Sequence, residues 1–441
     1  MIEAPISVIK IIETLEQTGY EAYAVGGCVR DSLLGRTPSD WDITTSARPE
    51  QVKALFSHTI DTGIQHGTVT VMLEHVGYEV TTYRIDGEYE DNRHPKEVIF
   101  TSLLTEDLKR RDFTINAMAW NPQKGMIDEF GGMADLEEGI IRCVGSPEER
   151  FSEDALRMMR AVRFSAQLGY EIEPATKAAI RKLAPNLRSV SAERIQVELV
   201  KLVESMHPDY LRVAYETGIT KVILPEFDRC METEQCNPHH CYTVGEHILH
   251  SMLAAPSNRY LRLTMLFHDI AKPETKKTDE QGIDHFHGHQ EAGAEMAKSI
   301  LRRLKFDNET IHVVSKLISF HDYRFPAERR SVRRAVWKVG EDLFPMLLQV
   351  KEADTMAQSF FERQEKLDWI ARVEALYHAI LKDRECLSLK DLAVTGRDLI
   401  QAGFEPGPEL GKILNEMLQD VLEHPEHNTK EYLLQYPHKI G

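Results

Sequence analysis

Two glycines and two aspartates within residues 25–45 (VGGCVRDSLLGRTPSDWDITT) have types and a spacing suited to phosphate chemistry. Asp40 and Asp42 lie in a segment that reads as extended, and side chains two apart in a β-strand point to the same face. Two carboxylates at such short range repel each other unless a cation lies between them. Mg²⁺ is usually held by one or two carboxylates plus substrate phosphates. Gly26 and Gly27 let backbone N–H groups approach a phosphate. The pattern predicts a site for Mg²⁺ and a nucleoside triphosphate; the alternative is a D-x-D in a surface turn.

Other charged residues of the N-terminal third extend this predicted catalytic site. Glu79 lies in the strand-like segment EVTTYR and is the best candidate for a third catalytic carboxylate, with a solvent-facing strand position as the alternative. Arg111, with Arg110 beside it, offers guanidinium forks that suit triphosphate oxygens. We therefore predict Asp40, Asp42 and Glu79 as catalytic residues, the first two as Mg²⁺ ligands.

The motif GG-x-x-RD-x-x-x-G-x-x-x-x-D-x-D resembles the first motif of the nucleotidyltransferase superfamily, in the class II branch of tRNA CCA-adding enzymes and bacterial poly(A) polymerases. Three later segments are similar to that branch as well. Residues 110–119 resemble its RRDFTINA segment, residues 153–157 its ED-x-x-R motif, and residues 191–198 its ERI-x-x-E helix. The four motifs follow the family's order, and this is what makes the resemblance specific.

The resemblance implies a nucleotide-binding set and a way of choosing the base. The implied set is Gly26, Gly27, Arg30, Arg111, Asp112, Asn116, Asp154, Arg157, Arg160 and Arg163. Asp112 and Asn116 would contact the nucleotide sugar, and would share a face if their segment is helical. Asp154 and Arg157 are three apart among strong helix formers, so we expect them to be neighbours on one helix face. The resemblance implies that they present an acceptor and donors to the Watson–Crick edge of the incoming base. This pair can satisfy the hydrogen-bonding groups of C, or those of A after a small rotation. G and U would leave buried groups without partners, at a cost of roughly 1–3 kcal/mol for each missing hydrogen bond.

A second group of residues, histidines and aspartates, lies in the C-terminal half. The order His247, His268-Asp269, His289, His321, Asp354 on helical segments resembles the HD superfamily of metal-dependent phosphohydrolases. Mixed His/Asp sites suit transition metals such as Ni²⁺, Mn²⁺ or Co²⁺. We predict that one ion is bound by His247, His268, Asp269 and Asp354. His289 and His321 are predicted to complete a second position. The alternative is a decayed HD fold in which these side chains are buried hydrogen-bonding groups. Four further histidines are interpreted as bystanders: His239, His240, His285 and His287.

The composition is that of a globular protein with an acidic balance. The chain has 441 residues and a formal net charge of −17, so RNA binding must depend on a local basic face. Residues 321–338 are one candidate for such a face, with a solvated helix face as the alternative. No apolar run approaches the ~18 residues of a membrane span, and the first residues do not read as a signal peptide. Six scattered cysteines without a C-x-x-C pair fit a reduced, cytoplasmic protein.

Hydrophobic periodicity predicts an α+β head followed by helical domains. Residues 6–18 are expected to form a helix that stops at Gly19, and residues 66–84 two strands around a turn at 75–77. The charged loop 82–98 has Arg84, Asp86, Asp91 and Arg93, which match what the family places near its catalytic pocket, with a plain solvated loop as the alternative. Helical periodicity takes over after about residue 150. The predicted domains are a nucleotidyltransferase head (1–145), a base-selecting neck (146–205), a body with the HD domain (206–355), and a tail that contacts tRNA (356–441).

Together these patterns predict a template-independent tRNA nucleotidyltransferase that adds CCA, or part of it, to tRNA 3′ ends. Its predicted partners are tRNA, CTP and ATP, without a membrane, and the oligomeric state stays open. The HD half is predicted to act on RNA 3′ phosphates or cyclic phosphates. The alternatives are a poly(A) polymerase, an A-only or CC-only adding enzyme, and an HD phosphohydrolase whose head only binds RNA.

Overall fold

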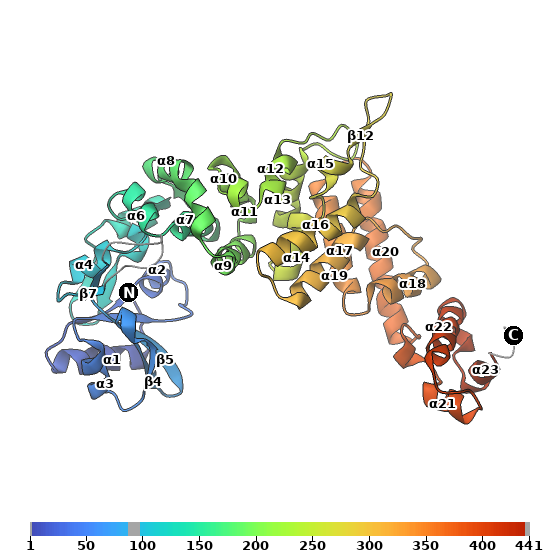
Figure 1. Cartoon of the computed structure of the whole chain (residues 1–441), viewed down its shortest axis with the longest axis horizontal. Coiled ribbons are helices and arrows are strands. Elements are labelled where there is room, and N and C mark those ends of the chain that lie inside the picture. Colours follow the sequence, from blue (N-terminus) through green and yellow to red (C-terminus); the bar gives the residue numbers. More distant parts are fainter. Residues whose placement is uncertain (1, 87–97, 437–441) are drawn as a thin grey trace. The chain divides into compact units, whose positions relative to one another are not determined.

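The structure is a computed structural model that describes residues 2–86 and 98–436, drawn in Figure 1. The chain folds into two compact units, residues 1–225 and 226–441. Strands gather in the first unit and helices make up nearly all of the second, which confirms the predicted α+β class. Asp91 and Arg93 of the predicted charged loop lie outside the described residues.

A seven-stranded mixed sheet forms the centre of the N-terminal unit. Its strand order is β3-β4-β5-β2-β1-β8-β9, and β2 pairs with β5 in parallel while the other neighbours are antiparallel. The strands are β1 (Ala22–Val25), β2 (Asp42–Thr45), β3 (Thr59–Gly63), β4 (Thr68–Leu73), β5 (Val76–Thr82), β8 (Ala119–Asn121) and β9 (Gly125–Ile127). The predicted hairpin is β4–β5. Its turn is Glu74–His75, one residue earlier than predicted, with positive φ angles of 50° and 65°, the handedness that suits a two-residue hairpin loop.

Short helices and two small strands complete this head. The predicted helix 6–18 is α1, and its residues Val8, Ile11, Ile12 and Leu15 are buried on one face. The elements are α1 (Ile6–Gln17), α2 (Gly27–Leu33), α3 (Pro49–Leu55), η1 (Ile64–His66), β6 (Arg84–Asp86), β7 (Val98–Phe100), α4 (Leu104–Lys109), η2 (Thr114–Asn116) and α5 (Gly132–Glu138). An apolar cluster that includes Tyr23, Tyr83 and Leu108 packs between the sheet and α4.

Helices take over after the head, as predicted. They are α6 (Pro147–Glu153), α7 (Leu156–Leu168), α8 (Pro174–Leu183), η3 (Ala184–Ser189), α9 (Ala192–Val203), η4 (Pro208–Tyr210), α10 (Leu211–Glu216) and α11 (Thr220–Ile223), with a small ladder of β10 (Ile140–Ile141) and β11 (Glu171–Ile172). Asp154 has extended backbone angles between α6 and α7, and its Oδ1 accepts the N–H of Leu156 at 3.1 Å. The expectation that Asp154 and Arg157 are neighbours on one helix face is therefore wrong, because Asp154 lies in the extended break after α6 and α7 begins at Leu156.

The C-terminal unit is a helical array with a separate small core at its end. Its elements are α12 (Pro225–Met231), α13 (Val244–Ala254), α14 (Arg259–Phe267), α15 (Lys272–Thr275), β12 (Lys277–Thr278), β13 (Asp284–His285), α16 (His289–Arg303), α17 (Asn308–Phe320), α18 (Arg329–Val339), α19 (Phe344–Ala357), α20 (Arg363–Lys382), η5 (Leu389–Asp391), α21 (Gly396–Gln401), α22 (Pro408–Glu423), η6 (Pro425–His427) and α23 (Lys430–Gln435). The end core extends from Cys386 to Leu433. Over the described ranges, no helix is long and apolar enough to cross a membrane.

The basic run 321–338 falls mainly on α18, where its arginines form ion pairs within the unit. Arg329 and Arg333 both pair with Glu385, and Arg330 and Arg334 both pair with Glu423. The Arg333–Glu385 distance is 2.6 Å and the Arg333 side chain is 5% exposed. Much of the positive charge of this run is therefore compensated by Glu385 and Glu423, which weakens the case for an RNA-binding face here.

Candidate active sites

The predicted catalytic carboxylates meet at the parallel pair β2 and β5. Asp42 is the first residue of β2 and is the register partner of Glu79 on β5. Asp40 precedes the strand by two residues, and all three side chains reach solvent while Trp41 between the aspartates is buried. Partial desolvation raises the pKa of Asp42 to about 6; Arg111 opposes the shift, and the charges of Asp40 and Glu79 add to it. A divalent cation between such carboxylates would relieve this repulsion.

Arg111 lies beside these carboxylates and against the glycine loop. A Cβ added at Gly26, whose φ is +83°, would lie 3.1 Å from Arg111 Nη1, so a side chain there would displace the guanidinium. The buried Nε of Arg111 has no hydrogen-bond partner among the described residues. Its Nη2 lies 3.6 Å from Asp107 Oδ2. A guanidinium with unused donors, next to Gly27 at the start of α2, is suited to a triphosphate.

Four of the predicted nucleotide-binding residues form one hydrogen-bonded chain. Arg30 Nη1 donates to Asn116 Oδ1 at 2.6 Å, and Asn116 Nδ2 donates to Asp112 Oδ1 at 3.2 Å. Arg160 Nε donates to Asp112 Oδ2 at 2.7 Å. Burial alone would raise the pKa of Asp112, but the charges of Arg160 and Arg157 lower it to about 2. Asp112 and Asn116 are brought together by a loop and η2 rather than by a shared helix face.

Arg163 is held inside the protein. Its Nε donates to Glu198 Oε2 at 2.5 Å, both side chains are under 10% exposed, and its guanidinium lies 3.8 Å from the centroid of the Phe164 ring. Arg30 and Arg160 also lie over that ring, at 4.9 and 5.4 Å. Nucleotide binding by Arg163 stays a prediction, because the contacts that the structure shows are with protein groups.

The two residues predicted to read the base have different partners. Asp154 accepts hydrogen bonds from Arg194 Nη1 and Nη2 at 3.2 and 2.7 Å. Arg157 contacts Glu153 at 2.5 Å and donates to the backbone oxygens of Arg150 and Arg110. Their backbones remain close, since Arg157 N donates to Asp154 O at 3.0 Å.

Sequence reasoning missed two residues of this region, Arg194 and Asp107. Asp107 on α4 is fully buried and accepts hydrogen bonds from Thr44 Oγ1 at 3.0 Å and Arg110 Nε at 2.9 Å. The signal was available for Asp107, because it precedes Arg110 and Arg111 by three and four residues, the spacing of neighbours on a helix. Arg194 lies within the ERI-x-x-E motif, but nothing in the sequence pairs it with Asp154 forty residues earlier.

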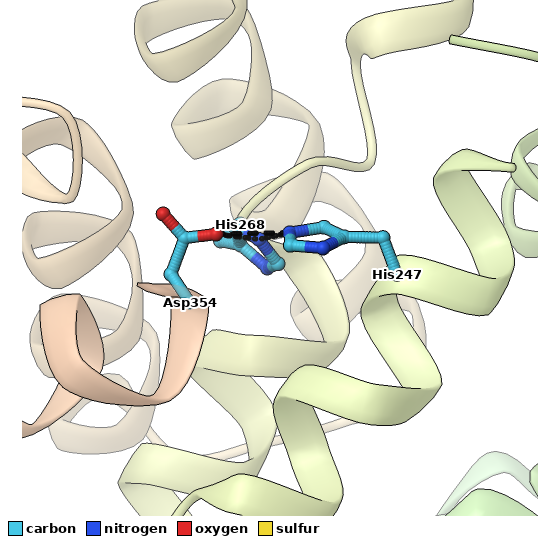
Figure 2. Close-up of side chains that lie close together, drawn as sticks. All are labelled: His247, His268 and Asp354. Carbon is cyan, nitrogen blue, oxygen red and sulfur yellow. Dashed lines mark hydrogen bonds and ion pairs between the residues drawn. The ribbon is translucent and has the colours of Figure 1, made fainter. Parts of the chain in front are cut away.

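The histidines and aspartates of the C-terminal unit come together in what we call the His–Asp cluster. Its first ligand set, shown in Figure 2, is His247 on α13, His268 at the end of α14, and Asp354 on α19. The Nε2 atoms of His247 and His268 are 3.2 Å apart, and His247 Nε2 is 2.9 Å from Asp354 Oδ1. The second ligand set is Asp269, His289 and His321, whose candidate ligand atoms also lie within 4.8 Å of one another.

Asp269 lies between the two ligand sets. Its Oδ2 is 3.5 and 3.4 Å from Nε2 of His247 and His268, and its Oδ1 is 3.5 and 3.8 Å from Nε2 of His289 and His321. The cationic neighbours hold the pKa of Asp269 well below its usual range against the effect of burial. A carboxylate with this placement would be within reach of a metal ion held by either set.

The histidine rings are oriented as metal ligands. Nδ1 of His268, His289 and His321 lies 2.7–2.8 Å from the carbonyl oxygens of Met265, Phe286 and Ile318. A carbonyl can only accept, so Nδ1 carries the proton and a neutral ring has its lone pair on Nε2. Those lone pairs converge, with Nε2 of His289 and His321 3.1 Å apart. Converging lone pairs repel, and a cation between them removes the repulsion, so the residues present fit a metal.

Charged and neutral neighbours surround the cluster. Lys272 Nζ lies 2.7 Å from Asp269 Oδ2 and donates to Gln235 Oε1 at 2.9 Å. Burial, with the charges of His268 and His289, lowers the pKa of His321 to about 4. His240, interpreted as a bystander, stacks edge-on against His247 with centroids 5.0 Å apart, and burial with Lys272 lowers its pKa to about 2.

Comparison with known families identifies segments along both units. Residues 22–142 match the family described as "Poly A polymerase head domain", residues 169–231 match "Probable RNA and SrmB- binding site of polymerase A", and residues 275–436 match a family described as tRNA nucleotidyltransferase domain 2. The first match contains the carboxylates on β2 and β5 and the arginine beside Gly26.

Relatives extend over nearly the whole chain. The CCA-adding enzyme of Levilactobacillus brevis is 36% identical over 428 residues, which are 96% of this chain and 95% of that protein. The CCA-adding enzyme of Latilactobacillus sakei is 37% identical over 97% of this chain and 96% of its own length. The crystal structure of the Bacillus stearothermophilus CCA-adding enzyme in complex with CTP is similar with a TM-score of 0.71 and 30% identity, and the match covers 99% of each chain.

Proposed function

From the premise that this chain belongs to the CCA-adding enzymes, which are tRNA nucleotidyltransferases, we propose that Asp40 and Asp42 hold Mg²⁺ for the addition of CCA to tRNA 3′ ends from CTP and ATP. The observation that carries this assignment is the in-register pair Asp42–Glu79 with Arg111 beside it. When bound, Mg²⁺ lowers the pKa of the attacking 3′ hydroxyl and neutralises charge at the leaving pyrophosphate. The third carboxylate of this site is Glu79.

The residues around the carboxylates position the nucleotide. We assign the triphosphate to Arg111 and the backbone of Gly26 and Gly27, because the glycine loop has no side chain that would displace the guanidinium. The sugar is assigned to Asp112 and Asn116, which Arg30 and Arg160 hold from either side. Rigid hydrogen-bonded side chains lower the cost of ordering the substrate.

The base is assigned to Asp154 and Arg157, with the protein acting as template. Asp154 offers only acceptors and Arg157 only donors, a combination that suits the edges of C and A. The structure adds Arg194 as the group that holds the Asp154 carboxylate. A poly(A) polymerase has to accept A and reject C, whereas these groups suit both bases.

One experiment separates full CCA addition from its alternatives. Unmodified tRNA lacking its terminus is mixed with each single NTP and with CTP plus ATP, and product masses are read. A CCA-adding enzyme extends by two C with CTP and by CCA with both nucleotides. Extension by A alone, by CC alone, or by a long A tract would assign an A-only enzyme, a CC-only enzyme or a poly(A) polymerase.

We also propose that the His–Asp cluster is an HD-type phosphohydrolase site. The supporting observation is the convergence of four Nε2 atoms on two carboxylates, Asp269 and Asp354. A bound Ni²⁺, Mn²⁺ or Co²⁺ would supply a water of lowered pKa for attack on phosphorus. Asp269 would contact both positions and Asp354 the first. A 2′,3′-cyclic phosphate or 3′ phosphate on damaged tRNA is the proposed substrate, since its removal restores the hydroxyl that the head extends.

The remaining assignments are proposals on the same basis. We propose a head at 1–145, a neck at 146–205, an HD body at 206–355 and a tRNA-contacting tail at 356–441; the separate core from Cys386 to Leu433 supports a distinct tail. tRNA, CTP and ATP are the proposed partners. A cytoplasmic location is in keeping with the six cysteines, all of which are free thiols.

A further inference from the structure

Two hollows adjoin the His–Asp cluster and share part of their border. One has a volume of about 440 Å³ and is lined by Asp269 and Lys272; the other has about 340 Å³ and is lined by Phe325 and Trp369. Asp354 of the first ligand set borders both hollows. We propose that the second hollow is a nucleobase slot, so that the cluster takes ribonucleotide phosphates rather than simple phosphate esters. This inference rests on the hydrolysis proposed above.

Aromatic side chains line the slot. The rings of Phe325 and Trp369 lie 5.0 Å apart at 68°, and Tyr323 lies 5.3 Å from Phe325. Trp369 Nε1 donates to the backbone oxygen of Phe325 at 3.0 Å. This bond fixes the indole and uses its only donor, so the ring can offer a ligand its face but no hydrogen bond. Stacking on aromatic faces is how proteins hold bases without regard to their sequence.

The inner wall of the slot is connected to a ligand of the cluster. Lys351 Nζ donates to the backbone oxygen of His321 at 2.7 Å and lies 5.7 Å from the Trp369 ring centroid. Its buried ammonium thus joins the aromatic wall to the residue that ends α17 and belongs to the second ligand set. A base in the slot would therefore lie next to the cluster, with its ribose directed toward the ligands.

Cations occupy the junction of the two hollows. Lys366 and Arg324 line both of them. Lys366 Nζ donates to Gln358 Oε1 at 2.7 Å, and the Arg324 side chain is 83% exposed. A phosphate attached to the ribose would reach these cations and the ligands at once, whereas a simple phosphate ester would fill only the polar hollow and leave the aromatic walls in water.

The slot can be tested by a readout that does not depend on hydrolysis. The full chain, which has four tryptophans, is labelled with 5-fluorotryptophan, and the Trp369 resonance is assigned by its loss in Trp369→Phe. We expect 3′-AMP to shift this resonance in the presence of EDTA, and inorganic phosphate to leave it in place. The proposal of a nucleobase slot is wrong if 3′-AMP does not shift the Trp369 resonance, or if inorganic phosphate shifts it equally.

Hydrolysis in the presence of Ni²⁺, Mn²⁺ or Co²⁺ gives the second readout. Trp369→Ala should raise KM roughly tenfold for adenosine 2′,3′-cyclic phosphate and for RNA ending in a cyclic phosphate, and leave glycerol 2-phosphate unaffected. Trp369→Phe should restore the wild-type KM, which separates stacking from folding, and Trp337→Ala on α18 is the matched control. If Trp369→Ala raises KM only for the RNA, the slot binds the end of a polynucleotide. If KM rises for both substrates, the slot also binds a free nucleotide.

The two proposals fail in different ways. An equal loss for glycerol 2-phosphate and the nucleotides in Trp369→Ala would contradict the slot while leaving hydrolysis in place. A Trp369 resonance that responds to 3′-AMP in a chain without any metal-dependent hydrolysis would contradict the phosphohydrolase and support a nucleotide-binding slot.

Discussion

The carboxylate of Asp154 is held by Arg194 through two hydrogen bonds of 3.2 and 2.7 Å. Asp154 lies at the break between α6 and α7, whereas Arg194 comes from α9. The orientation of an acceptor proposed to read the base is therefore set by a helix outside its own motif. An ion pair of this geometry also fixes the angle of the carboxylate plane.

We expect base selection to depend on this pair as well as on Arg157. Replacing both Asp154 and Arg157 with Ala should reduce discrimination among the four NTPs more than it lowers the rate with the best one. Arg194→Ala should reduce the preference for CTP and ATP by about tenfold, because losing a charge-assisted hydrogen bond costs about 1.5 kcal/mol or more. Single-NTP incorporation kinetics measure this, and exposed Arg188→Ala is the control. An unchanged preference in Arg194→Ala would show that Asp154 needs no support.

Asp40→Ala or Asp42→Ala should abolish nucleotide addition and leave tRNA affinity nearly unchanged. The proposed role of these carboxylates is to hold Mg²⁺ at the triphosphate, not to contact RNA. Addition is followed with labelled CTP and tRNA binding by gel retardation. Asp61→Ala is the control, since Asp61 is an exposed carboxylate on β3 of the same sheet. Near wild-type addition in either variant would remove the metal-ligand assignment.

Asp112 should make folding of the head sensitive to acid. Its pKa is about 2 in the folded chain and about 3.9 in an unfolded one, so folding favours its charged form. The stabilisation of about 2.6 kcal/mol is nearly complete above about pH 5 and is lost as the pH falls from about 5 toward about 1. In chains with Trp337→Phe and Trp369→Phe, whose remaining tryptophans are Trp41 and Trp120, urea unfolding with and without Asp112→Asn should give fluorescence curves that converge as pH falls. A gap that stays constant from pH 7 to 3 would contradict this, and Asp61→Asn should show no gap.

The two proposed activities should be separable. His268→Ala with Asp269→Ala should remove bound transition metal and metal-stimulated hydrolysis, because it deletes one histidine of the first set and the carboxylate that lies between the two sets. Addition of C and A should remain intact. Metal content is measured on the purified protein, and exposed His312→Ala on α17 is the control. If the wild-type chain binds no ion and added Ni²⁺, Mn²⁺ or Co²⁺ elicits no hydrolysis, the cluster is structural only.

Local patterns predicted the elements better than the partners of side chains. The helix at 6–18 and the hairpin in 66–84 follow from apolar spacing, which the chain itself encodes. The break at Asp154 could not be predicted, because helix formers surround it and the decisive hydrogen bond to the N–H of Leu156 competes with an ordinary helical turn.

The candidate sites divide in the same way. The six residues of the His–Asp cluster were identified from their order, and the structure brings all six together. The roles of Arg194 and Trp369 could not be predicted, because each depends on a contact with a residue more than thirty positions away. The basic run 321–338 shows the converse, since its sequence reveals the arginines but not the acidic residues beyond position 380 that pair with them.

Those ion pairs make the last helices of the chain responsive to ionic strength. Glu385 and Glu423 each form ion pairs with two arginines of α18. Charge attraction therefore adds to the apolar core in holding the segment after Cys386 in place. Arg330 and Arg334 are about half exposed and their attraction is screened over about 8 Å at physiological salt, whereas Arg333 is sheltered from ions. Rising salt should therefore loosen the contact between α18 and α22 at its outer edge first, while the inner pair keeps the segment attached.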